Sequence, residues 1–376
     1  MSRHSSKSSA AAPAPAVKGV QRQAVEFAYA EELARLRDQD RSPVPPGWLM
    51  SPIAVEKFIM GDDALGIERK FVAERAMVTR IIISLCTSRG CLLVGEPGTA
   101  KSWLSELLAA AISGDSTLTL QGGAVTHVGQ LLYSWNEAVI QKEGPTLNAL
   151  VPSPLLRGMQ EGRLVRFEEI ARCPQALQDA LLSVLSDRVV VIPELAGESG
   201  VVFARDGFNV VATSNSVDEG VHAMSAALKR RLDFEEIRPI RNLSDELDVV
   251  TREVRKENRK AGVEVEVDAE VIEVLVTMFH ELRNGQSLNG RSTDRLAGSA
   301  LSTAEAVSVA HATSLSAWYY GEGRMTLEQL MNHVVGSALK DQPDDRRRLR
   351  HYFDTEVAVK QGSHWQRVYD LRHLIQ

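Results

Sequence analysis

The sequence predicts an α/β protein, in which a parallel sheet carries helices on both faces and is followed by an all-helical domain. Between about residues 90 and 240, short apolar segments typical of buried strands alternate with segments of helical period. A glycine-containing loop at 95–102 (GEPGTAKS) joins the first of these strands to a helix. From about Leu243 onward helical segments dominate. Alternating strands and helices are typical of a parallel sheet covered by helices.

The first part of the chain is predicted to contain two helices before the first strand. Four apolar residues recur at three-residue steps and predict a helix over about 20–40: Phe27, Ala30, Leu33 and Leu36. Prolines and a glycine at 42–47 then break the chain. A second helix is predicted at 68–88, and it leads to the apolar run 90–95 (GCLLVG), which suits a buried parallel strand.

The later elements follow from the same periodicities. Strands are predicted at 116–123, 163–170 and 208–215, helices at 101–113 and 174–188, and a hairpin at 188–207. The clearest helices of the second domain are predicted at 268–283, 302–320 and 326–340.

Composition limits the class of protein and its partners. The chain has 376 residues, 44% of them hydrophobic, which is enough for two domains. The net charge of −6 gives no general attraction to nucleic acid or to anionic membranes, so nucleic acid is not an expected partner. No apolar run approaches the roughly 18 residues of a membrane helix. The three cysteines fit a reducing compartment, and we therefore expect a cytoplasmic protein.

The loop at 95–102 resembles the phosphate-binding pattern G-x-x-x-x-G-K-[ST], with Ala100 in place of the last glycine. Such a loop needs backbone N–H groups and a helix N-terminus facing the phosphates, a lysine for the terminal phosphates and a hydroxyl for Mg²⁺. Lys101 and Ser102 open the predicted helix, and Ala100 costs little if its φ is negative. A chance match is the alternative. The whole loop is predicted to bind the phosphates: Gly95, Glu96, Pro97, Gly98, Thr99, Ala100, Lys101 and Ser102.

Two carboxylates end the predicted strand in LVRFEEI, about 65 residues after the loop. We expect Glu168 to hold Mg²⁺ together with Ser102, and Glu169 to polarise the attacking water. The alternative is that both glutamates begin a helical turn, where negative charge is favourable.

Two further positions are candidates for catalysis. Asn215 ends the predicted strand 208–215 and can orient the water, although it can also be a turn asparagine. Arg230 and Arg231 follow a short helix, and an arginine there can stabilise transition-state charge in a neighbouring subunit. A solvated basic cluster is the alternative.

Taken in order, these motifs resemble those of the AAA+ ATPases, most of all the MoxR-like branch, over about residues 71–340. The resemblance rests on GEPGTAKS, FEEIARCPQALQDALLSVLSDR, RVVVIPE with GFNVVATSN, and ALKRRL. It implies a P-loop NTPase sheet of strand order 5-1-4-3-2 with a helical lid, and ATP bound between the subunits of a ring, usually a hexamer. By motif match Arg231 rather than Arg230 takes the arginine-finger position. MoxR-like proteins commonly act on partners that carry von Willebrand factor A domains.

The sequence departs from that family in two places. Glu168 replaces the usual magnesium-shell aspartate and is one methylene longer. At the expected place of a second sensor arginine, about 22 residues before MTL at 325–327, the sequence has Ala304. Arg291 and Arg295 lie upstream as possible substitutes.

The function predicted from the sequence is ATP hydrolysis with Mg²⁺ in an oligomeric ring that remodels a protein client. Two alternatives stay open: a nucleotide-dependent scaffold that does not hydrolyse, and a motor subunit of a nucleic-acid system, as in McrB-like GTPases. Tyr133 and Trp135 either grip a client or are simply packed. The expected segments are a disordered tail (1–22), an N-terminal helix and linker (23–52), the ATP-binding core (53–242), a helical lid (243–345) and a helical extension (346–376).

Overall fold

The structure is a computed structural model that describes residues 20–195, 200–215, 222, 224–293, 301–339 and 343–375. Two compact units divide the chain. The first comprises Met1–Leu92, Ser102–Ser214 and Gly220–Glu235, and the second comprises Leu93–Lys101, Asn215–Glu219 and Glu236–Gln376. Most of the predicted tail and Arg295 lie outside the described residues.

A five-stranded sheet forms the centre of the first unit. Its strands are β1 (Gly90–Gly95), β2 (Thr119–Gln121), β5 (Leu164–Glu168), β8 (Asn209–Asn215) and β9 (Leu232–Glu236). Their order in the sheet is β2-β5-β8-β1-β9. Numbered along the chain, these core strands have the order 2-3-4-1-5, which is the predicted 5-1-4-3-2 read from the other edge. The predicted fold class is therefore confirmed.

The register of the sheet brings two functional strand ends to the same edge. Strand β5 pairs in parallel with β2, where Glu168 faces Gln121, and in parallel with β8, where Phe167 faces Ala212. Apolar residues occupy most interior positions of both strands, Arg166 of β5 excepted, and the strands are largely buried, as parallel strands usually are. The polar residues that follow each apolar run consequently meet at the carboxyl edge.

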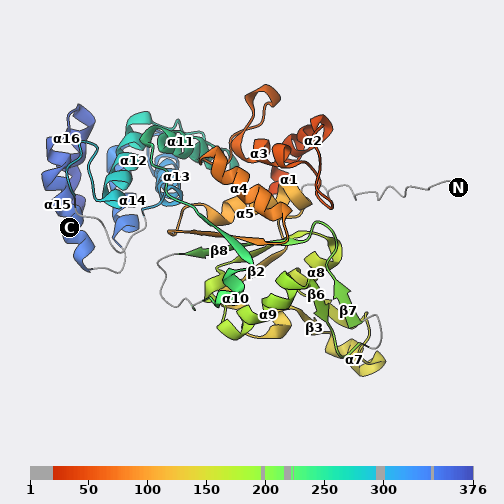
Figure 1. Cartoon of the computed structure of the whole chain (residues 1–376). Coiled ribbons are helices and arrows are strands. Elements are labelled where there is room, and N and C mark those ends of the chain that lie inside the picture. The colour runs from red at the N-terminus through yellow and green to blue at the C-terminus, as the bar shows by residue number, and fades with distance from the viewer. Residues whose placement is uncertain are drawn as a thin grey trace. The chain divides into compact units, whose positions relative to one another are not determined.

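Helices cover both faces of this sheet, with α4 and α5 on one side and α9 and α10 on the other (Figure 1). The helices of the first unit are α1 (Val25–Ala28), α2 (Ala30–Gln39), α3 (Pro52–Met60), α4 (Arg75–Cys86), α5 (Lys101–Ser113), α6 (Val128–Leu131), α7 (Glu137–Glu143), α8 (Pro154–Glu161), α9 (Gln175–Ser186) and α10 (Ala226–Lys229). Of these, α5 and α9 match the predicted ranges closely.

The N-terminal segment differs from its prediction. The predicted helix over about 20–40 is two helices, because Tyr29 leaves the helical conformation at φ −121° and ψ 29°. Helix α3 was not predicted, although the Ser51 hydroxyl caps it by accepting from the Ala54 amide and Pro52 occupies its first turn. Helix α4 begins seven residues later than predicted, at Arg75.

Two small hairpins extend from the sheet. Strands β6 (Val189–Val191) and β7 (Val201–Phe203) pair antiparallel, which confirms the predicted hairpin. Strands β3 (Tyr133–Trp135) and β4 (Leu150–Pro152) form the other pair. The rings of Tyr133 and Trp135 pack edge to face at 5.9 Å, and the Tyr133 hydroxyl donates to Glu194.

The second unit is helical after residue 242, as predicted. Its helices are α11 (Leu243–Lys260), α12 (Ala269–Asn284), α13 (Thr303–Tyr320), α14 (Leu327–Ala338), α15 (Pro343–Thr355) and α16 (Ser363–Asp370). One hydrophobic core joins all six, from Val250 on α11 to Val368 on α16. None of the described helices is both long enough and apolar enough to cross a lipid bilayer.

Buried carboxylates fasten these helices to one another. Glu246 of α11 accepts from Arg283 of α12 at 2.7 Å and from the Thr303 hydroxyl of α13 at 2.7 Å. Burial alone would raise the pKa of Glu246, but its hydrogen bonds and the Arg283 charge lower it to about 2. Glu281 of α12 accepts from Tyr352 of α15 at 2.5 Å. Because an unpaired buried charge is costly, these contacts fix how the helices pack.

Candidate functional site

The predicted phosphate-binding loop connects β1 to α5 and closes around the ammonium group of Lys101. Strand β1 ends at Gly95 and α5 begins at Lys101, both as predicted. The Lys101 side chain is buried, and its Nζ donates to the carbonyl oxygens of Gly95 at 3.0 Å and Glu96 at 2.7 Å. The Thr99 hydroxyl also donates to the Glu96 carbonyl, at 2.9 Å. The loop therefore presents its carbonyls inward, toward its own lysine.

Two residues of this loop have a positive φ. Gly98 has φ +76°, and a Cβ built on it would lie 2.2 Å from Cβ of Ser302. Ala100 has φ +62°. The expectation of a negative φ at Ala100 is therefore wrong, and the residue occupies the left-handed region that glycine favours. Its Cβ costs about 1–2 kcal/mol there, so the alanine destabilises the folded loop relative to a glycine.

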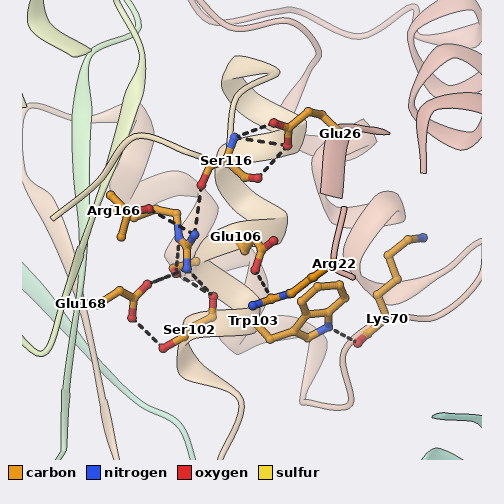
Figure 2. Close-up of polar contacts among 11 residues, drawn as sticks. Arg22, Glu26, Lys70, Ser102, Trp103, Glu106, Ser116, Arg166 and Glu168 are labelled. Carbon is orange, nitrogen blue, oxygen red and sulfur yellow. Dashed lines mark hydrogen bonds and ion pairs between the residues drawn. The ribbon is translucent and has the colours of Figure 1, made fainter. Parts of the chain in front are cut away.

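Glu168 is the most heavily bonded carboxylate at the carboxyl edge of the sheet (Figure 2). It is buried at the end of β5, and Figure 2 shows it beside Ser102 and Arg166. Its Oε2 accepts from the hydroxyls of Ser102 at 2.6 Å and Thr213 at 2.7 Å. Its Oε1 accepts from the Ser105 hydroxyl at 2.7 Å and from Arg166 at 2.9 Å. These four donors come from α5, β5 and β8.

The environment of Glu168 keeps its carboxyl group ionised. Burial alone would raise its pKa, but the hydrogen bonds from Ser102, Ser105 and Thr213 and the Arg166 charge together hold the pKa below its usual value. The carboxylate is therefore charged at neutral pH. A charged carboxylate beside a serine hydroxyl is an oxygen donor set of the kind that Mg²⁺ prefers.

Glu169, the predicted water activator, follows directly and leaves the strand in a strained conformation. Its φ of +54° is in the left-handed region, which is uncommon for residues other than glycine. Its amide N–H donates to the Thr213 hydroxyl at 3.0 Å, and its carboxylate pairs with Arg172 at 3.0 Å. Thr213 thus holds both glutamates, since the same hydroxyl donates to Glu168.

Two other predicted catalytic residues, Asn215 and Arg231, lie on other elements. Asn215 is the last residue of β8. Arg231 follows α10, and its Nε donates to the Ser186 hydroxyl, at the end of α9, at 2.8 Å. Arg230 is the exposed C-cap of α10. The structure therefore brings Ser102, Glu168 and Glu169 together and holds Arg231 against α9.

The second-sensor position is an ordinary helix start. Ser302 caps α13 in a capping box with Glu305, and Ala304 is exposed in the first turn. Arg291 is exposed as well, in the loop before that helix. Ser302 lies against Gly98 of the phosphate-binding loop, as the short Cβ distance indicates.

Three residues of the site were not predicted: Ser105, Arg166 and Thr213. Each carries a sequence signal that is visible in retrospect. Ser105 is three residues after Ser102 on the same helix and so shares its face. Arg166 is a charge inside an otherwise apolar strand, and Thr213 is two residues before Asn215, on the same side of β8.

A loop of the phosphate-binding pattern after the first strand of a 5-1-4-3-2 sheet, with an acidic residue of the third strand against the serine that follows the loop lysine, is typical of the P-loop NTPase fold. Residues 90–232 match the AAA domain of the dynein-related subfamily, and residues 244–376 match the YehL-like AAA+ ATPase C-terminal domain. The chain belongs to the MoxR-like AAA+ ATPases that carry a YehL-like C-terminal domain. The resemblance seen in the sequence is thereby confirmed.

Three known proteins are similar to this chain to different extents. The uncharacterized protein YehL of Escherichia coli strain K12 is 48% identical over 355 residues, which cover 94% of this chain and 97% of that protein. The gas vesicle ATPase GvpN of Haloferax mediterranei is 28% identical over 243 residues, which cover 59% of this chain and 65% of that protein. The crystal structure of NtrX from Brucella abortus aligns at a TM-score of 0.49 and 11% identity, covering 80% of this chain and 69% of that one.

The strain at Ala100 gives a testable consequence. Ala100→Gly removes the unfavourable Cβ contact of the left-handed conformation, which stabilises the folded state. It also makes the unfolded chain more flexible, which favours unfolding, and we expect the first effect to exceed the second by up to about 1 kcal/mol. We expect the free energy of unfolding in urea to rise slightly. The matched control is Ala261→Gly, at the exposed C-cap of α11 with φ −78°, which should instead destabilise the protein. Equal destabilisation by both changes would contradict the assigned strain.

Proposed function

We propose that this protein hydrolyses ATP with Mg²⁺, using one site that is completed by a neighbouring subunit. The observation that carries the proposal is the 2.6 Å hydrogen bond from the Ser102 hydroxyl to the ionised carboxylate of Glu168. Lys101, which would meet the terminal phosphates, is adjacent in the chain to Ser102, which would hold the metal together with Glu168. The backbone therefore links the phosphate-binding group directly to the metal-binding pair. The name of the relative GvpN, a gas vesicle ATPase, supports the same activity.

Phosphate binding would use the loop and its lysine. The Nζ of Lys101 would exchange its bonds to the Gly95 and Glu96 carbonyls for oxygens of the β- and γ-phosphates. The backbone N–H groups of residues 98–102 and the start of α5 would face the same negative charge. Because the ammonium is already positioned, little side-chain ordering remains to be done on binding.

Ser102 and Glu168 would hold the metal. Their oxygens are hard donors, and Glu168 already carries the negative charge that Mg²⁺ favours, so the residues present fit the ion. When bound, Mg²⁺ would neutralise negative charge that develops on the phosphate oxygens. The extra methylene of Glu168 is accommodated, because its carboxylate reaches the Ser102 hydroxyl directly.

Water activation is assigned to Glu169 with help from Asn215. Glu169 follows the metal-holding glutamate at the strand end, and its backbone is held by Thr213 of the neighbouring strand. Its carboxylate would leave Arg172 to accept a proton from the attacking water. Asn215, at the tip of the same neighbouring strand, would orient that water.

The remaining parts of the proposal concern assembly. We propose a homo-oligomeric ring, a hexamer, in which Arg231 of one subunit stabilises the transition state at the nucleotide of the next. The described hydrogen bond of the Arg231 side chain goes to a neutral partner, the Ser186 hydroxyl, which it can release at low cost. The client would be a protein with a von Willebrand factor A domain, remodelled through nucleotide-driven motion.

Glu169→Gln tests the assignment of the water activator. The change keeps the size of the side chain but removes the base, so the rate of phosphate release should fall by about a hundredfold or more. Binding of a fluorescent ATP analogue with Mg²⁺ should be preserved. Glu161→Gln, an exposed glutamate at the end of α8, is the control and should keep full turnover. Unchanged turnover in Glu169→Gln would show that the base is elsewhere, and no turnover in the unaltered protein would favour a scaffold.

A mixing experiment tests whether Arg231 acts in a neighbouring subunit. Arg231→Ala and Lys101→Met should each be nearly inactive. In Arg231→Ala the rate of ATP hydrolysis should fall by about a thousandfold. A mixture of the two should regain ATPase activity, because some interfaces then combine an intact Lys101 with an intact Arg231. Arg230→Ala serves as the control for loss of a charge next to the site. No recovery in the mixture would exclude the trans role of Arg231.

A further inference from the structure

Arg166 is a charged side chain in the middle of a core strand, and none of the roles proposed above uses it. Its side chain is 11% exposed, and its neighbours on β5, Val165 and Phe167, are fully buried. A long cationic side chain at such a place is unfavourable unless every donor is paired. All three nitrogens of its guanidinium are in fact paired.

These hydrogen bonds reach both ends of the proposed metal site. Nη2 donates to Oε1 of Glu168 at 2.9 Å and to the backbone carbonyl of Ser102 at 3.2 Å. Nε donates to the Ser105 hydroxyl at 2.9 Å, and that hydroxyl donates to the same Oε1 at 2.7 Å. One guanidinium therefore contacts both residues expected to hold Mg²⁺, and fixes a third residue that contacts one of them.

The two carboxylate oxygens of Glu168 accept hydrogen bonds from different partners. Oε1 is taken by Arg166 and Ser105, whereas Oε2 is directed toward the Ser102 and Thr213 hydroxyls. A glutamate has one more rotatable bond than an aspartate, so its carboxylate needs an additional restraint to occupy a single position. The guanidinium gives that restraint through two of its nitrogens: Nη2 donates to Oε1, and Nε donates to the Ser105 hydroxyl, which contacts the same oxygen.

The other side of the Arg166 guanidinium contacts Ser116, and the N-terminal segment in turn holds Ser116. Nη1 donates to the Ser116 carbonyl at 3.0 Å. Ser116 in turn donates its hydroxyl to Glu26 of α1 at 2.7 Å and its amide to both oxygens of that carboxylate at 3.2 Å. Figure 2 shows these residues as one row of polar contacts, from Glu26 through Ser116 and Arg166 to Glu168.

Further contacts join the same N-terminal segment to α5, the helix that carries Ser102. Arg22 pairs with Glu106 of α5 at 2.5 Å. The indole N–H of Trp103, next to Ser102, donates to the Lys70 carbonyl at 3.0 Å, and the Lys70 ammonium is buried against Glu32 of α2. The segment before the sheet is thus bonded to α5 at Trp103 and at Glu106, both shortly after the loop end (Figure 2).

We propose that Arg166 is a positioning residue for Mg²⁺ binding: it anchors Oε1 of Glu168 so that Oε2 stays beside the Ser102 hydroxyl, and Glu26 of α1 holds the acceptor at its other end. This inference rests on the proposed ATPase function. It makes the N-terminal segment part of the nucleotide site although that segment contributes no ligand. It also accounts for a glutamate at the magnesium-shell position, since the longer side chain reaches both Arg166 and Ser102.

The experiment compares nucleotide affinity with and without metal. A fluorescent ADP analogue is titrated into the full chain in Mg²⁺ and in EDTA, and the ratio of the two affinities is the readout. Loss of a residue that orients a metal ligand typically costs tenfold to a hundredfold in metal affinity. In Arg166→Met we expect the ratio to fall by about tenfold or more, while the affinity in EDTA stays within about twofold of the unaltered chain, because the loop and Lys101 are intact.

Two further variants define the effect. Arg166→Lys keeps the charge but not the fork of donors, so it should restore less than half of the lost ratio on a logarithmic scale. Arg163→Met is the matched control: this arginine directly precedes β5 and pairs with Glu161 at 2.8 Å and Asp115 at 3.5 Å, without contacting Glu168. It should keep the ratio of the unaltered chain. Melting temperatures establish that each variant is folded.

Glu26→Gln decides the question if Arg166→Met does not fold. It weakens the hold on Ser116 without touching Arg166, and the affinity ratio should fall to between that of the unaltered chain and that expected for Arg166→Met. An unchanged ratio in folded Arg166→Met, or in Glu26→Gln where only that variant folds, would make Arg166 a stabilising residue alone and overturn the inference. An unaltered chain that binds the analogue equally with and without Mg²⁺ would instead overturn the proposed function as well.

Discussion

The site depends on one buried negative charge, the carboxylate of Glu168, and on the four groups that donate to it. An ionised carboxylate inside a protein is stable only when its oxygens are hydrogen-bonded. Here the donors come from α5, β5 and β8, so satisfying the charge fixes these three elements at the edge where the strands end. Stability and site geometry consequently rest on the same contacts, and a change to any donor affects both.

Strain accompanies this charge. Ala100 and Glu169 are both in the left-handed region, one in the phosphate-binding loop and one directly after Glu168. Residues held in such conformations cost about 1–3 kcal/mol each and cluster at functional sites. The hydrogen bond from the Glu169 amide to Thr213 offsets part of the cost. Buried carboxylates also connect elements in the C-terminal helices. There Glu246 and Glu281 accept hydrogen bonds from neighbouring helices and so hold those helices together.

Much of the fold could be predicted from local pattern. The bounds of β1 and α5 follow from an apolar run, a glycine and a helical period, and the strand order follows from the family resemblance. Helix α3 was not predicted: it is only nine residues long, follows soon after the predicted break at 42–47 and carries a proline in its first turn. Tyr29 interrupts the first helix without a glycine or proline to mark the place. Arg166, Ser105 and Thr213 escaped prediction for a different reason. Ser105 and Arg166 are 61 residues apart, and Glu168 and Thr213 are 45 apart, so only the folded sheet reveals their contact.

The most direct test of the central claim is the effect of Ser102→Ala on the gain in nucleotide affinity that Mg²⁺ provides. Isothermal titration calorimetry of ADP, in Mg²⁺ and in EDTA, measures that gain, and Ser183→Ala on the exposed side of α9 is the control. If Ser102 and Glu168 hold the metal together, Ser102→Ala should lose about tenfold or more of the gain and Ser183→Ala none. A Ser102→Ala protein that is folded, binds ADP and keeps the full gain would contradict the account.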